Sequence, residues 1–173
     1  MYLAYVTTTE RGATDRLLSA AAEQLLKTGA QLSGVVQTNT ECADSSKCDM
    51  DVRVLPAGET IRISQSLGEQ SRGCRLDPAA LEQAVGYVTS SLADAPQLLV
   101  VNKFGKHEAD GRGFRPVIAE ALALDIPVLV GVNGLNREKF EAFTDGAAEQ
   151  IAPEVDAIIE WFARVTAERA AAA

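Results

Sequence analysis

The segment from Thr7 to Thr14, T-T-T-E-R-G-A-T, has half of a pattern that binds phosphate groups between a strand and a helix. The full P-loop pattern, G-x-x-x-x-G-K-[ST], uses glycines so that backbone N–H groups surround phosphate, a Lys to neutralise charge and a hydroxyl to bind magnesium. Gly12 and Thr14 match the second Gly and the hydroxyl, but Thr7 and Ala13 replace the first Gly and the Lys. One interpretation is a plain strand-to-helix turn. The other is a degenerate anion site formed by Thr8, Thr9, Gly12 and Thr14.

A second candidate is the loop N-K-F-G-K-H-E-A-D-G-R-G, which follows the apolar run 98–101. Lys103, Lys106 and Arg112 concentrate positive charge in this loop, and such a patch favours binding of an anion. Lys103 or Lys106 could also replace the Lys that the first loop lacks. Glu108 is the candidate catalytic residue, because its carboxylate could orient a water molecule. The alternative is a solvated basic loop whose cations pair with the acidic residues beside them.

Three cysteines flank a predicted hairpin, with Cys42 and Cys48 before it and Cys74 after it. Three thiolates together with His107, the single histidine, could bind zinc. Soft sulfur ligands also suit molybdenum or copper. Because the C-x5-C spacing is wider than in most structural zinc sites, three interpretations stay open: a metal site, a redox or disulfide pair, and ordinary thiols.

These candidates need elements that hold them in place, and the sequence predicts strands that alternate with helices. The predicted strands are 2–7, 31–37, 98–101 and 126–132. The first predicted helix follows Gly12 and ends at Lys27, and the other predicted helices are 78–92, 114–124, 135–143 and 153–170. This order predicts an α/β fold with three layers, in which a mostly parallel twisted sheet has helices on both faces. Segments 51–55 and 60–64 alternate apolar with polar residues and predict an antiparallel hairpin insertion.

In a sheet of this kind the ligand site lies at the carboxyl ends of the parallel strands. Both candidate loops directly follow predicted strands, so we expect them to meet at that edge.

With both loops considered, the chain resembles a branch of the P-loop nucleoside-triphosphatase fold, close to the family once called cancer-related. The segments that carry this resemblance are G-V-V-Q at 34–37, the hairpin 51–64 and V-V-N-K-F-G-K-H-E at 100–108. The resemblance implies a P-loop NTPase-like fold. In that family the apolar strand ends in acidic residues, whereas here Asn102 and Lys103 take their place.

Over its whole length the chain also resembles an uncharacterised bacterial family of degenerate P-loop proteins, often associated with molybdenum transport. The matching motifs are C-D-M-D at 48–51, G-C-R-L-D at 73–77 and N-K-F-G-K-x-E-x-x-G-R-G at 102–113. This second resemblance is the source of the expected link to molybdenum.

Length and charge exclude several classes of protein. A length of 173 residues predicts one domain over 1–173. A net charge of −8 argues against a nucleic-acid-binding protein, because phosphate contacts need surplus positive charge. The sequence has neither an apolar run of about 20 residues nor the start of a signal peptide, so we expect a cytoplasmic protein without membrane insertion. Trp161 and Phe162 are expected to pack in the core or between two copies of a homodimer.

The sequence therefore favours a cytoplasmic protein that binds an anionic small molecule at a degenerate P-loop, with little or no hydrolysis. The expected ligand is a nucleotide with Mg²⁺, or an oxyanion such as molybdate. One alternative is an active nucleoside-triphosphatase with a site rebuilt around Lys103 or Lys106. The other is a thiol-based metal-binding or redox-sensing module that uses Cys42, Cys48 and Cys74.

Overall fold

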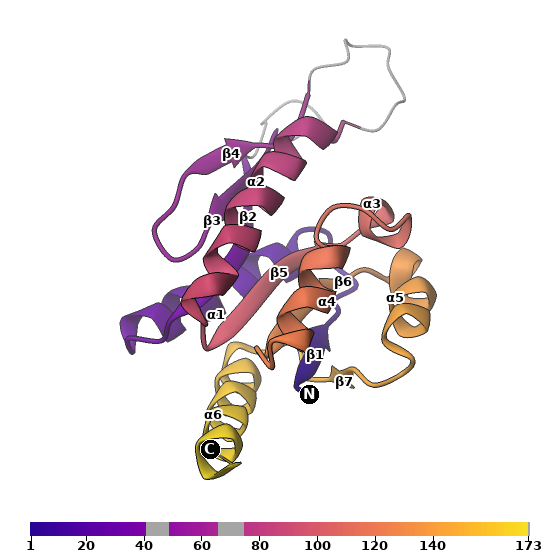
Figure 1. Ribbon diagram of the computed structural model, residues 1–173. Helices are drawn as coiled ribbons and strands as arrows, with labels where there is room; N and C mark the ends of the chain where they lie inside the picture. The colour runs from indigo at the N-terminus through magenta and orange to yellow at the C-terminus, as the bar shows by residue number, and fades with distance from the viewer. Residues whose placement is uncertain (41–48, 66–74, 173) are drawn as a thin grey trace.

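In the computed structural model, which describes residues 1–40, 49–65 and 75–172, one sheet runs through the molecule (Figure 1). Its strand order is β4-β3-β2-β5-β6-β1-β7. The strands are β1 (Leu3–Val6), β2 (Leu32–Thr40), β3 (Asp49–Val54), β4 (Thr60–Arg62), β5 (Leu98–Phe104), β6 (Val128–Val132) and β7 (Glu149–Gln150). From β2 to β7 all neighbours pair in parallel, while β3 and β4 extend the β2 edge as antiparallel strands. The predicted mostly parallel sheet with an antiparallel hairpin is confirmed.

Helices cover both faces of this sheet (Figure 1). They are α1 (Ala13–Lys27), α2 (Pro78–Ser91), α3 (Lys106–Ala109), α4 (Arg115–Ala123), α5 (Arg137–Thr144) and α6 (Val155–Ala172), with short 3-10 turns at η1 (Leu92–Asp94) and η2 (Gly134–Asn136). Because side chains alternate across a strand, the sheet supplies two separate cores. Ala4 and Val6 pack with α1 and α6 on one face, whereas Leu3 and Tyr5 pack with α2, α4 and α5 on the other.

The start of α2 shows how the sequence fixes a helix end. Asp77 is the N-cap, and its carboxylate accepts hydrogen bonds from the backbone N–H groups of Ala79 at 2.9 Å and Ala80 at 3.2 Å. Pro78 follows at the first helical position, where its missing N–H is not needed. The helix start predicted at Asp77 and Pro78 is confirmed.

Strand β2 and strand β5 approach each other closely at Gly34. This residue has φ +114°, and a Cβ atom added there would clash with the backbone of Val100. Only glycine accepts both this conformation and this contact readily. The close pairing brings the carboxyl ends of β2 and β5 side by side, where the candidate site lies.

The structure carries β2 on to Thr40 and β5 on to Phe104, beyond their predicted ends, and it adds β7. Strand β5 continues past Val101 through Asn102, Lys103 and Phe104, which we had placed in a loop. Lys103 is exposed between two buried residues, so the apolar run ends before the strand does. Strand β7 was not predicted, because it has just two residues, both exposed and polar.

Candidate functional site

A cavity of about 1170 Å³ lies at the carboxyl ends of β2, β5 and β6 and beside the start of α1. This is the edge at which the α/β architecture predicts a ligand site. Its cationic and histidine lining residues are Arg11, Arg16, Arg75, Lys103, Lys106 and His107; its acidic lining residues are Asp15, Glu23 and Glu108. The cavity therefore carries a surplus of positive charge in a chain whose net charge is −8.

The loop after β1 forms a closed turn that leads into α1. Gly12 has φ 74°, in the left-handed region, and directly precedes the helix. The hydroxyl groups of Thr8 and Thr14 are hydrogen-bonded to each other at 2.7 Å, which joins the two ends of the loop. Arg16 pairs with Glu10 at 2.7 Å. Glu10 therefore lies opposite a cation, rather than leaving its charge unbalanced near the site.

Of the four residues predicted to surround an anion in this loop, only Gly12 lines the cavity. Thr8 and Thr14 bond to each other beside it, and Thr9 is exposed. The role of the three threonines as anion ligands stays a prediction. Arg11 and Arg16, which sequence reasoning had missed, do line the cavity. They flank Gly12 in the sequence, and their position next to a helix start was the available signal.

Asp15 is the centre of a polar network on the floor of the cavity. Its carboxylate accepts a hydrogen bond from the side-chain amide of Asn102 at 2.8 Å and another from that of Asn39 at 2.6 Å. The Asn102 oxygen accepts the backbone N–H of Gln37 at 2.9 Å, and the Gln37 side chain donates to Asn39 at 2.7 Å. We call these four residues the cavity floor. They join α1, β2 and β5 through neutral amide donors around one carboxylate.

Asn102 is buried, with 2% of its surface exposed, and both ends of its amide are used. In this contact the carboxylate is supplied from α1 by Asp15, and β5 supplies the amide. The charge therefore lies on the helix, and the strand residue is neutral.

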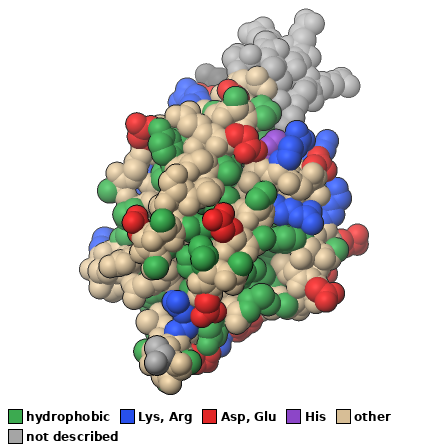
Figure 2. Space-filling model, viewed as in Figure 1, with side chains coloured by type: hydrophobic (Ala, Val, Ile, Leu, Met, Phe, Trp, Pro, Cys, Tyr) green, Lys and Arg blue, Asp and Glu red, His purple; other side chains and the backbone are tan. Residues whose placement is uncertain are grey.

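The predicted basic loop is divided between two hollows. Lys103 and Lys106 are exposed and line the cavity. Arg112 instead lines a separate, shallower hollow of about 610 Å³, together with Glu82 and His107. Figure 2 shows Lys and Arg side chains beside the single histidine, with acidic side chains among them. The structure therefore supports two of the three predicted cations as neighbours in one cavity and places Arg112 outside it.

Glu108 stabilises the conformation of the segment after β5 through hydrogen bonds to its backbone. Its side chain is buried, with 4% of the residue exposed, and its carboxylate accepts the backbone N–H groups of Gly105 at 2.9 Å and Phe114 at 3.2 Å. A Cβ atom at Gly113, which has φ +59°, would clash with this carboxylate. Glu108 also lines the cavity. Both oxygens have backbone donors, so the observed geometry is that of a positioning residue, and the predicted orientation of water stays a prediction.

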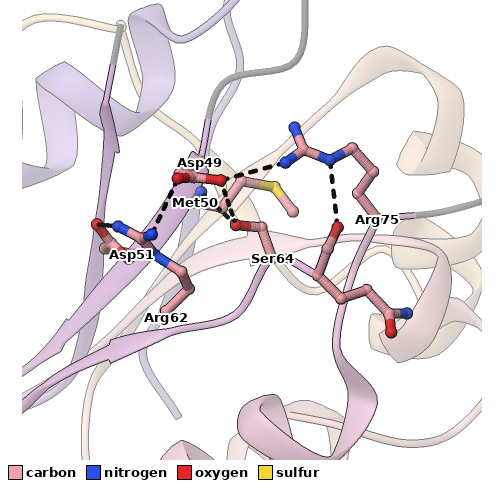
Figure 3. Close-up of polar contacts among 7 residues, drawn as sticks. Asp49, Met50, Asp51, Arg62, Ser64 and Arg75 are labelled. Carbon is pink, nitrogen blue, oxygen red and sulfur yellow. Dashed lines mark hydrogen bonds and ion pairs between the residues drawn. The ribbon is translucent and has the colours of Figure 1, made fainter. Parts of the chain in front are cut away.

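Beyond the cavity floor, the base of the β3–β4 hairpin carries a cluster of ion pairs that we call the hairpin clasp (Figure 3). Its members are Asp49, Asp51, Arg62, Ser64 and Arg75. Asp49 is the centre, because Arg62 lies 2.9 Å from one of its oxygens and Arg75 lies 3.1 Å from the other. The clasp ties the start of β3 to the segment that leads into α2.

Cys42, Cys48 and Cys74 lie outside the described residues, so the predicted thiol site stays a prediction. Within the part of the chain that the structure describes, no group of three or more His, Cys, Asp and Glu side chains could hold a metal ion. In the same residues, no helix is long and apolar enough to cross a membrane.

Comparison with known proteins places the chain in a family. Residues 3–161 match the family described as "Protein of unknown function (DUF2478)", and the chain belongs to it. The chain is also 37% identical over 148 residues to the "Molybdenum import ATP-binding protein ModC 2" of Bradyrhizobium diazoefficiens. That match covers 86% of this chain and 16% of the relative, so the chain spans a small part of the relative's length.

Two solved structures share the fold. A human cancer-related nucleoside triphosphatase superposes with a TM-score of 0.63 at 18% identity and covers 87% of each chain. THEP1 from the hyperthermophile Aquifex aeolicus has a TM-score of 0.63 at 11% identity and covers 89% of this chain and 90% of its own. The predicted P-loop NTPase-like fold and the resemblance to the cancer-related family are confirmed.

Proposed function

We propose that this member of the DUF2478 family is a cytoplasmic protein that binds an anionic small molecule, with little or no hydrolysis. The observation that carries the proposal is the cavity at the strand ends, where Arg11, Arg16, Lys103 and Lys106 line one space in an acidic chain. Cations that converge beside a helix start favour anions electrostatically. The degenerate P-loop borders the same space through Gly12.

The size and lining of the cavity favour a nucleotide over a bare ion. Pockets that enclose organic ligands have volumes of about 300–1,000 Å³, and this cavity reaches about 1170 Å³. Apolar residues line part of the wall, among them Val35, Val52 and Leu81. A ligand with a phosphate-bearing end and a larger uncharged body uses both kinds of lining. A nucleotide has both parts.

Three positions explain why hydrolysis would be slow. In P-loop enzymes a Lys and a Mg²⁺-holding acid neutralise the charge that develops on the transferred phosphoryl group. This chain has Ala13 at the Lys position and the neutral Asn102 in β5, directly after the apolar run 98–101. Glu108, the remaining candidate for orienting water, is engaged by two backbone donors. Loss of a single group that stabilises transition-state charge lowers kcat by about 10²–10³ in other enzymes, so these departures together favour binding without turnover.

Mg²⁺ would enter this site together with a nucleotide. The ion prefers oxygen ligands, usually one or two carboxylates together with phosphate oxygens. Asp15 offers a carboxylate in the lining of the cavity, and each of its oxygens already accepts one amide hydrogen bond. The cavity floor therefore fits an ion held mainly by the ligand's own phosphates.

An oxyanion such as molybdate is the second candidate ligand. It is favoured by the relative named as a molybdenum import ATP-binding protein, of which this chain matches a segment. A tetrahedral oxyanion could use the same cations. It would fill a small part of the cavity, so the geometry ranks it behind a nucleotide.

Isothermal titration calorimetry tests this proposal directly. ATP, GTP, molybdate and sulfate are titrated in turn into the protein at low salt with Mg²⁺. We expect saturable binding of a nucleotide that weakens about tenfold in Lys103→Ala, since hydrogen bonds to charged groups contribute about 1.5–3 kcal/mol. Lys139→Ala is the matched control, because Lys139 is an exposed Lys on α5 outside the cavity lining and pairs with Asp110. No heat with any of the four anions would reject the proposal.

Phosphate release under the same conditions separates binding from the rebuilt-NTPase alternative. We expect little or no release. Release that is lost in Lys103→Ala or Lys106→Ala, and kept in Lys139→Ala, would establish an active site rebuilt around those lysines.

A further inference from the structure

Arg75 belongs to two neighbouring features of the molecule at once. Its side chain lines the cavity, and it is also a member of the hairpin clasp, where Nη2 lies 3.1 Å from Oδ1 of Asp49 (Figure 3). The other cations of the cavity come from the loop and first turns of α1 and from the segment around α3. Arg75 comes from the segment before α2 and so reaches the cavity from the hairpin side.

Asp49 does not depend on Arg75 for its hydrogen bonds. Arg62 lies 2.9 Å from Oδ2 of Asp49, and the Ser64 hydroxyl donates to Oδ1 at 3.2 Å. If Arg75 moved away, each oxygen of Asp49 would keep one donor. Breaking an ion pair is costly when it leaves a buried charge without a partner. Departure of Arg75 does not do this to Asp49, because each Asp49 oxygen keeps a donor.

The Arg75–Asp49 pair is also accessible to solvent. The exposed fraction is 24% for the Arg75 side chain and 33% for that of Asp49. Ion pairs of this kind contribute about 0.2–1 kcal/mol, so an anion in the cavity can compete for the guanidinium group. A guanidinium presents several N–H donors in one plane, a geometry that matches two oxygens of a tetrahedral oxyanion.

We propose that Arg75 is a ligand-binding residue that exchanges Asp49 for the anionic group of the ligand, so that Asp49 acts as its internal competitor. This inference rests on the proposed function and adds a residue that no P-loop position would identify. The chemical group recognised is a tetrahedral oxyanion, either a phosphate of a nucleotide or free molybdate. Occupancy of the cavity then loosens the contact between Arg75 and Asp49 at the base of the hairpin.

The exchange predicts opposite effects for the two members of the pair. Removal of the Arg75 charge removes a ligand contact and weakens binding. Neutralisation of Asp49 removes the competitor and strengthens binding. A purely structural ion pair predicts the same direction for both changes, because either variant breaks the same contact.

Calorimetry of the full chain distinguishes the two cases, with ATP plus Mg²⁺ and with molybdate as separate probes. We expect Arg75→Gln to bind the recognised probe about tenfold more weakly. We expect Asp49→Asn to bind it about threefold more tightly. Asp51→Asn is the matched control, since Asp51 lies on the same strand as Asp49 and pairs with Arg62 at 2.9 Å. The Asp51→Asn variant should bind the probe with the affinity of the wild type. Thermal unfolding of each variant shows that it is folded, and Arg75→Lys retains the charge as a second test of the site.

Each outcome decides the matter. If the wild type binds a probe and the Arg75 and Asp49 variants both weaken it, or both leave it unchanged, Arg75 is not a ligand-binding residue and the proposed function stands. If Asp49→Asn binds no tighter than the wild type, the exchange is rejected, whatever the Arg75→Gln and Arg75→Lys variants show. If the wild type binds neither probe, the proposed function fails and this inference fails with it.

Discussion

The cavity floor and the hairpin clasp are two polar clusters of similar size, each built around one aspartate, yet they differ in their donors and in their exposure. Asp15 in the floor accepts neutral amide hydrogen bonds, and its partner Asn102 is 2% exposed. Asp49 in the clasp faces guanidinium groups, and the Arg62 side chain beside it is 56% exposed. The floor joins helix α1 to strands β2 and β5 of the sheet, whereas the clasp joins the hairpin to the segment before α2.

From this difference we expect the floor to be structural and the clasp to be exchangeable. A buried polar group that loses its partner costs about 1–3 kcal/mol, because water does not replace the lost hydrogen bond. A half-exposed ion pair that opens is solvated at once and loses about 0.2–1 kcal/mol. We therefore expect the floor to keep its geometry when a ligand binds and the clasp to be the part that rearranges.

The largest effect is expected from Asn102→Asp. At present the Asn102 side-chain amide donates to the Asp15 carboxylate at 2.8 Å. The new carboxylate at position 102 would face that of Asp15 and could not donate this hydrogen bond. We expect the free energy of unfolding to fall by about 3 kcal/mol, as when a buried charge loses its compensation. Chemical denaturation at neutral pH measures the change. The double variant Asp15→Asn with Asn102→Asp restores a donor opposite a carboxylate, so it should recover most of the loss.

Asn133→Asp is the matched control for that experiment. The Asn133 side-chain oxygen accepts hydrogen bonds from the backbone and side-chain amides of Asn136 at 3.1 and 2.9 Å, a role that a carboxylate also fills. Its unfolding free energy should change little. If Asn102→Asp were as mild as this control, or if the double variant were no more stable than Asn102→Asp, the floor would not be the fixed element described above.

A smaller loss is expected from Glu108→Ala. Glu108 resembles the floor, because it is a buried carboxylate that accepts neutral donors from the backbone of Gly105 and Phe114. Removal of this acceptor should lower the free energy of unfolding by about 2 kcal/mol. Glu120→Ala, an exposed glutamate on α4, is the comparison variant and should be nearly neutral. If the stability of Glu108→Ala were unchanged, Glu108 would not stabilise the fold, and its role would be purely functional.

The smallest effect on stability is expected at the clasp. Asp49→Asn should lower the unfolding free energy by about 0.5 kcal/mol at low salt. In about 1 M salt the loss should disappear, since the Debye length shortens to about 3 Å. The loss in Asn102→Asp should persist at the same salt concentration because the floor is buried. Equal salt sensitivity in the two variants would erase the distinction between the two regions.

The fold was largely predictable because most of its strands are apolar or alternating runs and its helices have apolar stripes or clear caps. Asp77 and Pro78 show this best, since Asp77 caps the helix through the backbone N–H groups of Ala79 and Ala80 and Pro78 is its first residue. Such local contacts can be predicted from neighbouring residues in the sequence. Strand β7 was missed because Glu149 and Gln150 are exposed and leave no hydrophobic pattern.

The cavity was less predictable, because its key contacts join residues that are distant in the chain. Asp15 and Asn102 are 87 positions apart, and nothing local to either indicates the hydrogen bond between them. Lys103 and Lys106 could be expected close together because one short loop carries both, and both line the cavity. Arg75 was missed because its place on the cavity wall depends on how the hairpin packs.

We propose that this acidic chain binds a nucleotide in its cationic cavity and scarcely hydrolyses it. The most direct test is one calorimetric titration of the wild-type protein with ATP and Mg²⁺ at low salt, followed by measurement of free phosphate in the same cell. We predict saturable heat and no phosphate above the level of the buffer control. The absence of heat, or rapid release of phosphate, would contradict the account.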